Sequence, residues 1–170
     1  LLAGSEAVGA FEPLGILVAG SRGAQLITPQ RLIVATGAFE RARPVPGWTL
    51  PGVMTTGAVQ TLLRSYRVIP GRRVLVAGNG PLNLQVALEL VRAGAAVVAI
   101  AEAAPAPGAG SLGALGQMLA GSPALVAKGA AIIAELRARG IAIRYRTALD
   151  RIEQHATGLR VDLATAGTTP

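Results

Sequence analysis

The stretch over residues 72–102, RRVLVAGNGPLNLQVALELVRAGAAVVAIAE, constrains the fold more than any other part of the chain. Its apolar run over residues 74–77 is unbroken, which is typical of a parallel strand that is covered on both faces. A glycine turn follows, and residues 82–92 then carry apolar side chains at three- and four-residue steps. A second apolar run, over residues 96–101, ends at Glu102. This order predicts a strand, a tight turn, a helix and a second parallel strand.

The turn after the first strand is suited to a nucleotide phosphate. Gly78 can make the tight turn, and Gly80 lets the main chain approach a ligand with no side chain in the way. Pro81 suits the first helical position, because its φ is already helical and the amide hydrogen that it lacks would have no helical partner. Free amides and the positive end of the helix dipole favour an anion here. We therefore take as cofactor-binding candidates Gly78, Asn79, Gly80, Pro81 and Leu82.

Several roles in this unit stay open, because the dinucleotide fingerprint G-x-G-x-x-G is incomplete. Asn83 stands at the third glycine, which normally lets helix and strand pack closely, so the unit can bind a dinucleotide or keep only the fold. Asn79 can face a phosphate or cap the helix, and Asn83 is more typical of a helix face bonded to backbone. Glu102 is a cofactor-binding candidate, since a carboxylate at this strand end can bond ribose hydroxyls, but it can also be a solvated strand end.

The charge of the chain limits the classes of partner. A formal net charge of +7 and a pI of about 11.4 invite a nucleic-acid interpretation. However, the basic residues are nearly all Arg and are scattered, aromatic residues make up 3%, and no helix-turn-helix or zinc-finger pattern occurs. We expect no nucleic acid as a partner, because a positive field around a phosphate-binding cleft explains the charge as well.

The chain offers few groups for metal binding or covalent catalysis. The absence of cysteine excludes a disulfide framework, a zinc ribbon, an iron–sulfur ligand set and a cysteine nucleophile within this segment. Since His155 is the one histidine, we expect no metal site. No nucleophile–base pair or catalytic pair of carboxylates is visible in the pattern, so we predict no catalytic residue.

Residues 103–127 carry no charge, which meets a length criterion for a membrane span. The run contains Pro105, Pro107 and Pro123 and few large side chains, so we interpret it as a loop followed by a short helix and expect no membrane span. No charged segment followed by an apolar core occurs at the N-terminus, so we expect no signal peptide and a cytoplasmic protein.

The segment before the nucleotide unit predicts a small β region and a linker. We interpret three β-prone runs separated by turns as a β-meander, over residues 7–11, 14–19 and 24–28. Residues 31–35 predict a buried strand that ends at Thr36 and Gly37. Pro and Gly then cluster around Trp48, which predicts a stiff linker over residues 38–52 at a domain boundary.

The remaining elements follow from periodicity and caps. Thr55 or Thr56 can cap a helix that runs to Arg67, and Gly94 is the expected C-terminal cap of the helix in the nucleotide unit. Beyond Glu102 we expect a proline-rich loop, a helix over residues 125–139 stopped by Gly140, a half-exposed strand over 141–146, a hairpin of 151–154 with 159–164, and a frayed end at 167–170.

Three motifs in this order carry a family resemblance: LIVATG at residues 32–37, PVPGWTLPGVMTT at 44–56 and VLVAGNGPLNLQ at 74–85. The chain resembles the middle of a flavoprotein with two dinucleotide-binding domains, of the pyridine nucleotide-disulfide oxidoreductase superfamily. Within it the chain is similar to the FAD-containing subunits of opine oxidase, hydrogen cyanide synthase and dye-linked proline dehydrogenase. The resemblance covers about residues 7–164.

The resemblance implies an α/β fold, a Rossmann-like three-layer domain with a parallel sheet and a β-meander, preceded by a partial FAD-domain β segment. Residues 1–46 would be the remnant of the FAD-binding domain, with Thr36 and Gly37 near the flavin. Residues 47–170 would be the NAD(P)-binding-like domain. The FAD fingerprint would lie upstream of Leu1, so we expect an excised fragment that is inactive alone.

The function implied is that of an FAD-dependent oxidoreductase that transfers hydride between FAD and NAD(P)H or an amine or imino-acid substrate. Its cofactors would be FAD in the intact protein and NAD or NADP at the second site, and a second oxidoreductase subunit is an expected partner. The alternative is a non-catalytic, degenerate Rossmann module that binds ATP or a partner subunit.

Three departures from the superfamily pattern bear on these expectations. No Cys-x-x-Cys occurs, which excludes disulfide reductase chemistry. Gln85 stands where many relatives that use NAD(P)H have Glu. Aligned without a gap, Ala101 rather than Glu102 falls at the ribose-binding position, and a shift of one residue turns a strand side chain to the other face.

Arg and Lys are absent from residues 103–110, which favours NAD over NADP.

Overall fold

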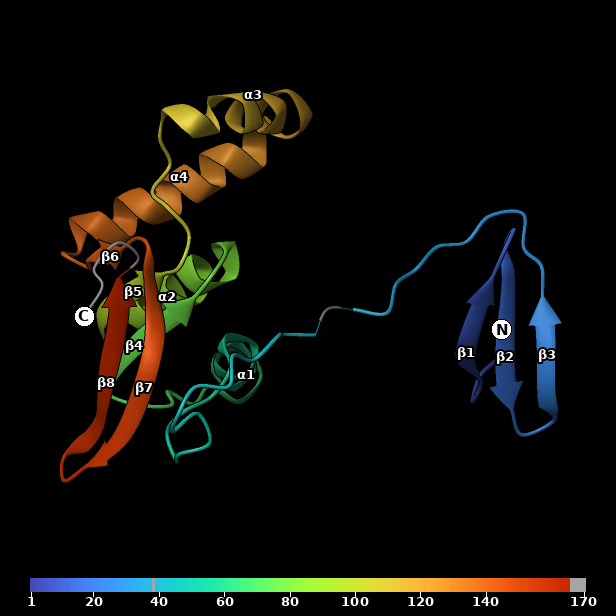
Figure 1. Cartoon of the computed structure of the whole chain (residues 1–170), viewed down its shortest axis with the longest axis horizontal. Coiled ribbons are helices and arrows are strands. Elements are labelled where there is room, and N and C mark those ends of the chain that lie inside the picture. Colours follow the sequence, from blue (N-terminus) through green and yellow to red (C-terminus); the bar gives the residue numbers. More distant parts are fainter. Residues whose placement is uncertain (38, 166–170) are drawn as a thin grey trace. The chain divides into compact units, whose positions relative to one another are not determined.

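The computed structural model describes residues 1–37 and 39–165 of the chain (Figure 1). Its internal contacts divide the chain into two compact units, Leu1–Phe39 and Glu40–Pro170, and each is described by itself. The predicted frayed end at residues 167–170 lies outside the described residues. The assignment of residues 1–46 and 47–170 to two cofactor domains stays a prediction.

The first unit contains a three-stranded antiparallel sheet. Its strands are β1 (Glu6–Phe11), β2 (Gly15–Gly20) and β3 (Gly23–Ile27), and their order in the sheet follows the chain (Figure 1). A bulge interrupts the β1–β2 register between Ala7 and Gly9. The predicted β-meander is therefore confirmed.

The predicted buried strand over residues 31–35 is wrong. These residues lie outside any strand, and the side chains of Ile33 and Val34 are 89% and 72% exposed. A strand needs a neighbouring ladder of hydrogen bonds and a covered face, and within the described residues this segment pairs with neither β3 nor another strand. An apolar run predicts which residues favour burial, but the described chain supplies nothing to bury these.

The second unit is built on a parallel sheet of three strands, in the order β4-β5-β6. Strand β4 (Arg73–Gly78) is followed by helix α2 (Pro81–Arg92), and β5 (Ala96–Glu102) pairs with β4 in parallel. The predicted strand, turn, helix and strand are confirmed. Strand β6 (Ile143–Arg144) also pairs in parallel with β5, but it is shorter than predicted.

Helices and a hairpin pack on this sheet. Helix α2 contacts β4, β5 and α4 (Pro123–Ala138), and strand β7 contacts both β4 and β5. The hairpin of β7 (Thr147–His155) and β8 (Gly158–Thr165) confirms the one predicted from the sequence. The result is the layered α/β arrangement of helices, parallel sheet and hairpin that the sequence predicts (Figure 1).

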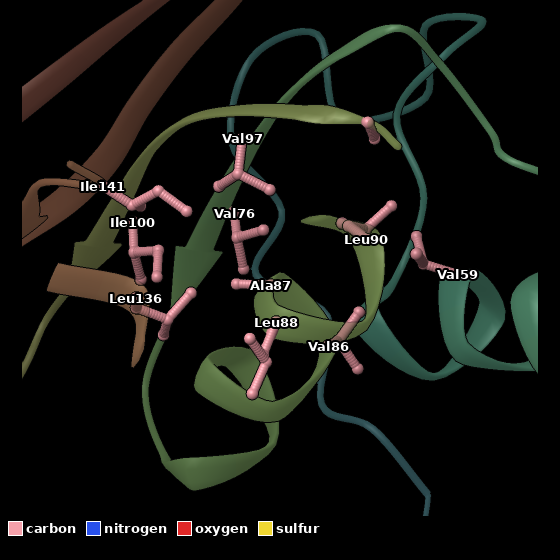
Figure 2. Packing of buried hydrophobic residues seen from close by; sticks show 11 residues of the cluster. Val59, Val76, Val86, Ala87, Leu88, Leu90, Val97, Ile100, Leu136 and Ile141 are labelled. Atoms are coloured by element: carbon pink, nitrogen blue, oxygen red, sulfur yellow. The ribbon is translucent and has the colours of Figure 1, made fainter. Parts of the chain in front are cut away.

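The core lies between the helices and the parallel sheet. Figure 2 shows residues from α2 and α4 pointing toward residues of β4 and β5. The largest fully buried side chains are Leu90 and Val86 on α2, Ile100 on β5 and Leu136 on α4. Burial of such a side chain stabilises the fold by about 1.5–3 kcal/mol, so the core fixes α2, and with it the preceding turn, against the sheet.

Helix α2 ends where the sequence predicts. The N–H of Ala95 donates to the carbonyl of Leu90 and that of Gly94 to the carbonyl of Val91, both at 3.0 Å. This pair of bonds is a Schellman motif, and Gly94 has the positive φ, 97°, that the motif requires. The cap turns the chain directly into β5.

Two further helices frame the second unit. Helix α1 (Thr56–Thr61) continues into the π-helical turn η1 (Leu62–Tyr66), which confirms the helix predicted before β4. Helix α3 (Leu112–Gly121), preceded by the 3-10 turn η2 (Ala109–Ser111), lies within residues 103–127, where the sequence predicts a loop followed by a short helix. In the part of the chain that the structure describes, no single helix is long and apolar enough to cross a membrane. Helices α3 and α4 satisfy that test together, as a pair bent by 120°.

Candidate nucleotide-binding turn

The turn between β4 and α2 depends on two glycines. Gly78 has φ 154°, and Gly80, the N-cap of α2, has φ 115° and ψ 170°, a conformation that L-residues rarely adopt. Apart from its two chain neighbours, no atom of the described residues lies within 4 Å of a Cβ built on Gly80. The backbone therefore requires glycine here although the protein does not crowd the position, and the space that a side chain would fill is open to a ligand.

The carboxylate of Glu102 lies at this turn. Gly78 and Glu102 are opposite each other in the parallel β4–β5 register. Oε2 of Glu102 accepts a hydrogen bond from the N–H of Gly80 at 3.3 Å, and Oε1 accepts one from the N–H of Ala104 at 3.2 Å. Glu102 is 6% exposed, so it is not a solvated strand end. Glu102, and not Ala101, presents its side chain to the turn.

Asn83 takes up the space that the third glycine of the fingerprint would leave open. Its side chain is buried, with 7% exposure, and its Oδ1 accepts a hydrogen bond from Oγ1 of Thr56 at 2.8 Å. Its Nδ2 would lie 2.7 Å from a Cβ on Gly78. Asn83 therefore contacts the turn from the helix side, and its side chain bonds to the neighbouring helix α1.

The other candidates at the turn are exposed. Asn79, Pro81 and Leu82 all lie at the surface, with Leu82 38% exposed. The N-cap of α2 is Gly80 and has no side-chain cap bond, so Asn79 does not cap the helix. A phosphate-facing role for Asn79 stays a prediction.

Thr36 and Gly37 belong to the first unit, where both are exposed. Gly37 has φ 80° and no protein atom within 4 Å of a Cβ position. Their expected place beside a flavin stays a prediction.

The hydrogen bonds made by Glu40 and Thr56 were not predicted from the sequence. Oε2 of Glu40 accepts a hydrogen bond from the N–H of Gly57 at 2.6 Å, and Thr56 bonds to Asn83. Thr55 and Thr56 were equal candidates for the cap of α1, and the structure assigns the cap to Thr55, whose hydroxyl accepts from the N–H of Ala58 at 3.4 Å. The sequence signal for these bonds was the pair of threonines, because only one of them can cap the helix and the other is free to bond to Asn83.

Neither of two hollows in the second unit contains the turn. One, of about 900 Å³, lies among the linker, β4, β5 and the β7–β8 hairpin. The other, of about 580 Å³, lies beside Arg64, Arg67 and Arg92. A diphosphate held by main-chain amides at the end of a parallel sheet needs an open edge, not an enclosed cavity, so the turn remains the candidate site.

A second polar cluster joins α2 to η1. Nε2 of Gln85 donates to Oε1 of Glu89 at 3.0 Å, and Nε of Arg64 donates to Oε2 of Glu89 at 3.1 Å. Burial disfavours the charged form of Glu89, but the hydrogen bonds from Arg64 and Gln85 outweigh it and lower the pKa of this carboxyl. Gln85 is thus bonded to an ionised partner on its own helix.

Comparison with known proteins shows relatives in sequence and in fold. No protein-family model matches the chain. An opine oxidase subunit from Rhizobium meliloti is 35% identical over 153 residues, which cover 88% of this chain and 33% of the relative. Hydrogen cyanide synthase subunit HcnB from Pseudomonas protegens is 36% identical over 130 residues, 76% of this chain and 27% of the relative. An opine oxidase subunit from Agrobacterium tumefaciens is 42% identical over 99 residues, 58% of this chain and 19% of the relative.

Solved structures share the fold. A pyridine nucleotide-disulfide family oxidoreductase from Enterococcus faecalis superimposes with a TM-score of 0.52 at 19% identity, covering 94% of this chain and 34% of that one. An NAD-dependent persulfide reductase from A. fulgidus gives a TM-score of 0.54 at 15% identity, covering 94% and 28%. The chain thus shares the fold of pyridine nucleotide-disulfide oxidoreductases and is similar in sequence to subunits of opine oxidase and hydrogen cyanide synthase. This confirms the resemblance carried by the three sequence motifs.

This chain corresponds to only part of its relatives. It spans from 19% to 33% of the length of the three curated relatives above. The activity, substrate and partners of the whole protein are therefore proposals.

Proposed function

We propose that the turn between β4 and α2 binds the diphosphate of NAD, in an FAD-dependent oxidoreductase. The observation that carries the proposal is the position of the Glu102 carboxylate, bonded to the N–H of Gly80 beside an open space. In a Rossmann unit, the diphosphate lies at the helix N-terminus and an acid at the end of the second strand bonds the ribose hydroxyls. Gly80 and Glu102 provide both groups at one edge of the sheet.

The residues present fit a dinucleotide with a free ribose diol. The start of α2 is exposed at Pro81 and Leu82, and the positive end of the helix dipole favours an anion there. Pro81 has no N–H, and the N–H of Asn83 already donates to the carbonyl of Gly80 at 3.3 Å. The negative charge of Glu102 favours hydroxyl donors and repels a 2′-phosphate, which supports NAD over NADP. When bound, the nicotinamide supplies or accepts a hydride, and this chain's part is to bind and orient the nucleotide.

In the intact protein we propose an FAD-dependent enzyme with a second subunit, on the basis of the relatives named as subunits of opine oxidase and hydrogen cyanide synthase. The flavin would exchange a hydride with NAD(P)H or with an amine or imino-acid substrate. Thr36 and Gly37 would lie near the flavin. The cytoplasmic location expected from the sequence stays part of this proposal.

One observation favours a second candidate, a degenerate Rossmann module that binds ATP or a partner subunit. Asn83 fills the position of the third glycine, so the close helix–strand approach of the complete fingerprint is altered. ATP offers phosphates and a ribose diol to the same turn, and discrimination between the two nucleotides requires measurement.

Amide correlation spectra of the labelled protein, recorded during addition of NAD and then of ATP, test the proposal. NAD is expected to shift the amides of Gly80, Leu82 and Ala104 in a saturable manner, because these N–H groups surround the proposed diphosphate and ribose positions. Shifts confined to other elements, or none at any concentration of NAD, would contradict it. Saturable shifts at these amides with ATP alone would favour the second candidate.

A further inference from the structure

Asn83 on α2 contacts both the nucleotide turn and another element. Asn83 is the third residue of the helix, and its Nδ2 lies 2.7 Å from the position that a Cβ on Gly78 would occupy. Its Oδ1 accepts from Oγ1 of Thr56 at 2.8 Å. A movement of the Gly78 peptide toward the helix would therefore displace a side chain that is bonded to α1.

The next contact leads from α1 to the linker. Thr56 is the first residue of α1, and the N–H of the following residue, Gly57, donates to Oε2 of Glu40 at 2.6 Å. Glu40 begins the second unit, at the point where the chain leaves the first. We call this series, Asn83, Thr56, Gly57 and Glu40, the linker bridge. It connects the nucleotide turn to the start of the linker through two hydrogen bonds and one peptide unit.

The segment between Glu40 and Thr56, which contains most of the predicted linker and is called the linker from here on, is also held at its middle. The N–H of Ile152 on β7 donates to the carbonyl of Pro46 at 2.9 Å, and Val45 is buried. Gly47 has φ 84°, and a Cβ there would overlap the carbonyl of Ile152. The middle of the linker is thus fixed by backbone contacts with β7, and the hydrogen bond between Glu40 and Gly57 connects its two ends.

We propose that Asn83 is a positioning residue that couples the order of the linker to nucleotide bound at the turn. This inference rests on the proposed function, because the ligand must order the Gly78–Pro81 turn. A bound diphosphate restricts the turn, the restricted turn holds Asn83 in one rotamer, and that rotamer keeps its acceptor on Thr56. The third glycine of the usual fingerprint has no side chain and cannot make this connection, so the Asn in its place gains a specific role.

Hydrogen exchange of linker amides, with ADP as the probe, tests the coupling. In the wild-type protein, saturating ADP is expected to slow exchange over residues 40–57 by about fivefold or more, the lower range of typical coupling between sites. In Thr56→Val, which has similar volume but no hydroxyl donor, ADP still binds and slows exchange at the turn, but the linker response is lost. Thr56→Ser retains the hydroxyl and should restore the response.

Thr55→Val is the matched control, because it removes the α1 cap and leaves the bond between Thr56 and Asn83 intact. Its linker is expected to respond to ADP as the wild type does. A full ADP response in Thr56→Val, or an equal loss in Thr55→Val, would overturn the coupling and leave the proposed function standing. If ADP, NAD and ATP all fail to bind the wild type, the proposed function and the coupling are both refuted, and thermal melts of each variant separate this result from unfolding.

Discussion

Substitution of Gly80 by Ala separates the conformational role of this glycine from its role in binding. At φ 115° and ψ 170°, an L-residue costs about 1–3 kcal/mol of backbone strain. No protein atom lies within 4 Å of the new Cβ, so steric overlap within the protein adds nothing to this cost. For a domain of this size, each kcal/mol lowers the melting temperature by about 2–4 °C, so a fall of about 2–12 °C is expected.

The effect on binding has a different origin. The new methyl group enters the open space beside the N–H that donates to Glu102, where the diphosphate is proposed to lie. Loss of one well-placed main-chain contact, or displacement of the phosphate by the methyl group, is expected to weaken NAD affinity at least tenfold, which is about 1.4 kcal/mol. Titration calorimetry measures the affinity, and urea unfolding measures the stability.

Gly94→Ala is the matched control at the opposite end of α2. Gly94 also has positive φ, 97°, and no protein atom within 4 Å of a Cβ position. It should lose about 1–2 kcal/mol of stability from the same backbone cause and keep its NAD affinity. If Gly80→Ala binds NAD as the wild type does, or if both variants lose affinity in parallel with stability, the reasoning about the turn is refuted.

Three further substitutions test other parts of the account. Glu102→Gln keeps one side-chain oxygen as an acceptor but removes the charge, so affinity for NADP should rise relative to NAD in parallel titrations, and an unchanged ratio would contradict a ribose role. The pKa of Glu89 is lowered from 4.5 in the folded state, so its stabilising contribution is present above about pH 4.5 and is lost as pH falls through the folded value. In urea unfolding, Glu89→Gln should therefore be less stable than the wild type at neutral pH. The two proteins should be equally stable at a pH below the folded-state pKa of Glu89, and a stability difference that does not change with pH would contradict this. Arg67 has φ 57° and ψ 31° at the end of η1, so Arg67→Gly should raise the free energy of unfolding by about 1 kcal/mol, whereas a decrease would show that the Arg side chain contributes more than the strain costs.

The nucleotide unit could be predicted from the sequence because its signals are local. The unbroken apolar runs of β4 and β5 reflect strands covered on both faces, and Pro81 and Gly94 mark the helix between them. The hairpin of β7 and β8 joins two strands that are neighbours in the chain, with Gly158 at the turn between them. Where neighbours along the chain decide the structure, the pattern was sufficient.

The failures arise where the structure depends on contacts distant in sequence. Residues 31–35 have the composition of a buried strand, but burial requires a covering layer that a local pattern does not reveal. The bond between Thr56 and Asn83 joins residues 27 apart, and no spacing rule relates them. The ungapped alignment with the superfamily pattern put Ala101 at the ribose-binding position. In the structure the β4–β5 register sets Glu102 opposite Gly78, one residue further along the strand.

Titration calorimetry of the wild-type protein with NADH, and then with ATP, tests the central claim most directly. We predict saturable binding of NADH with a micromolar Kd, weakened at least tenfold in Gly80→Ala and kept in Gly94→Ala. Absence of NADH binding, with or without binding of ATP, would contradict the assignment of the turn between β4 and α2 as an NAD site.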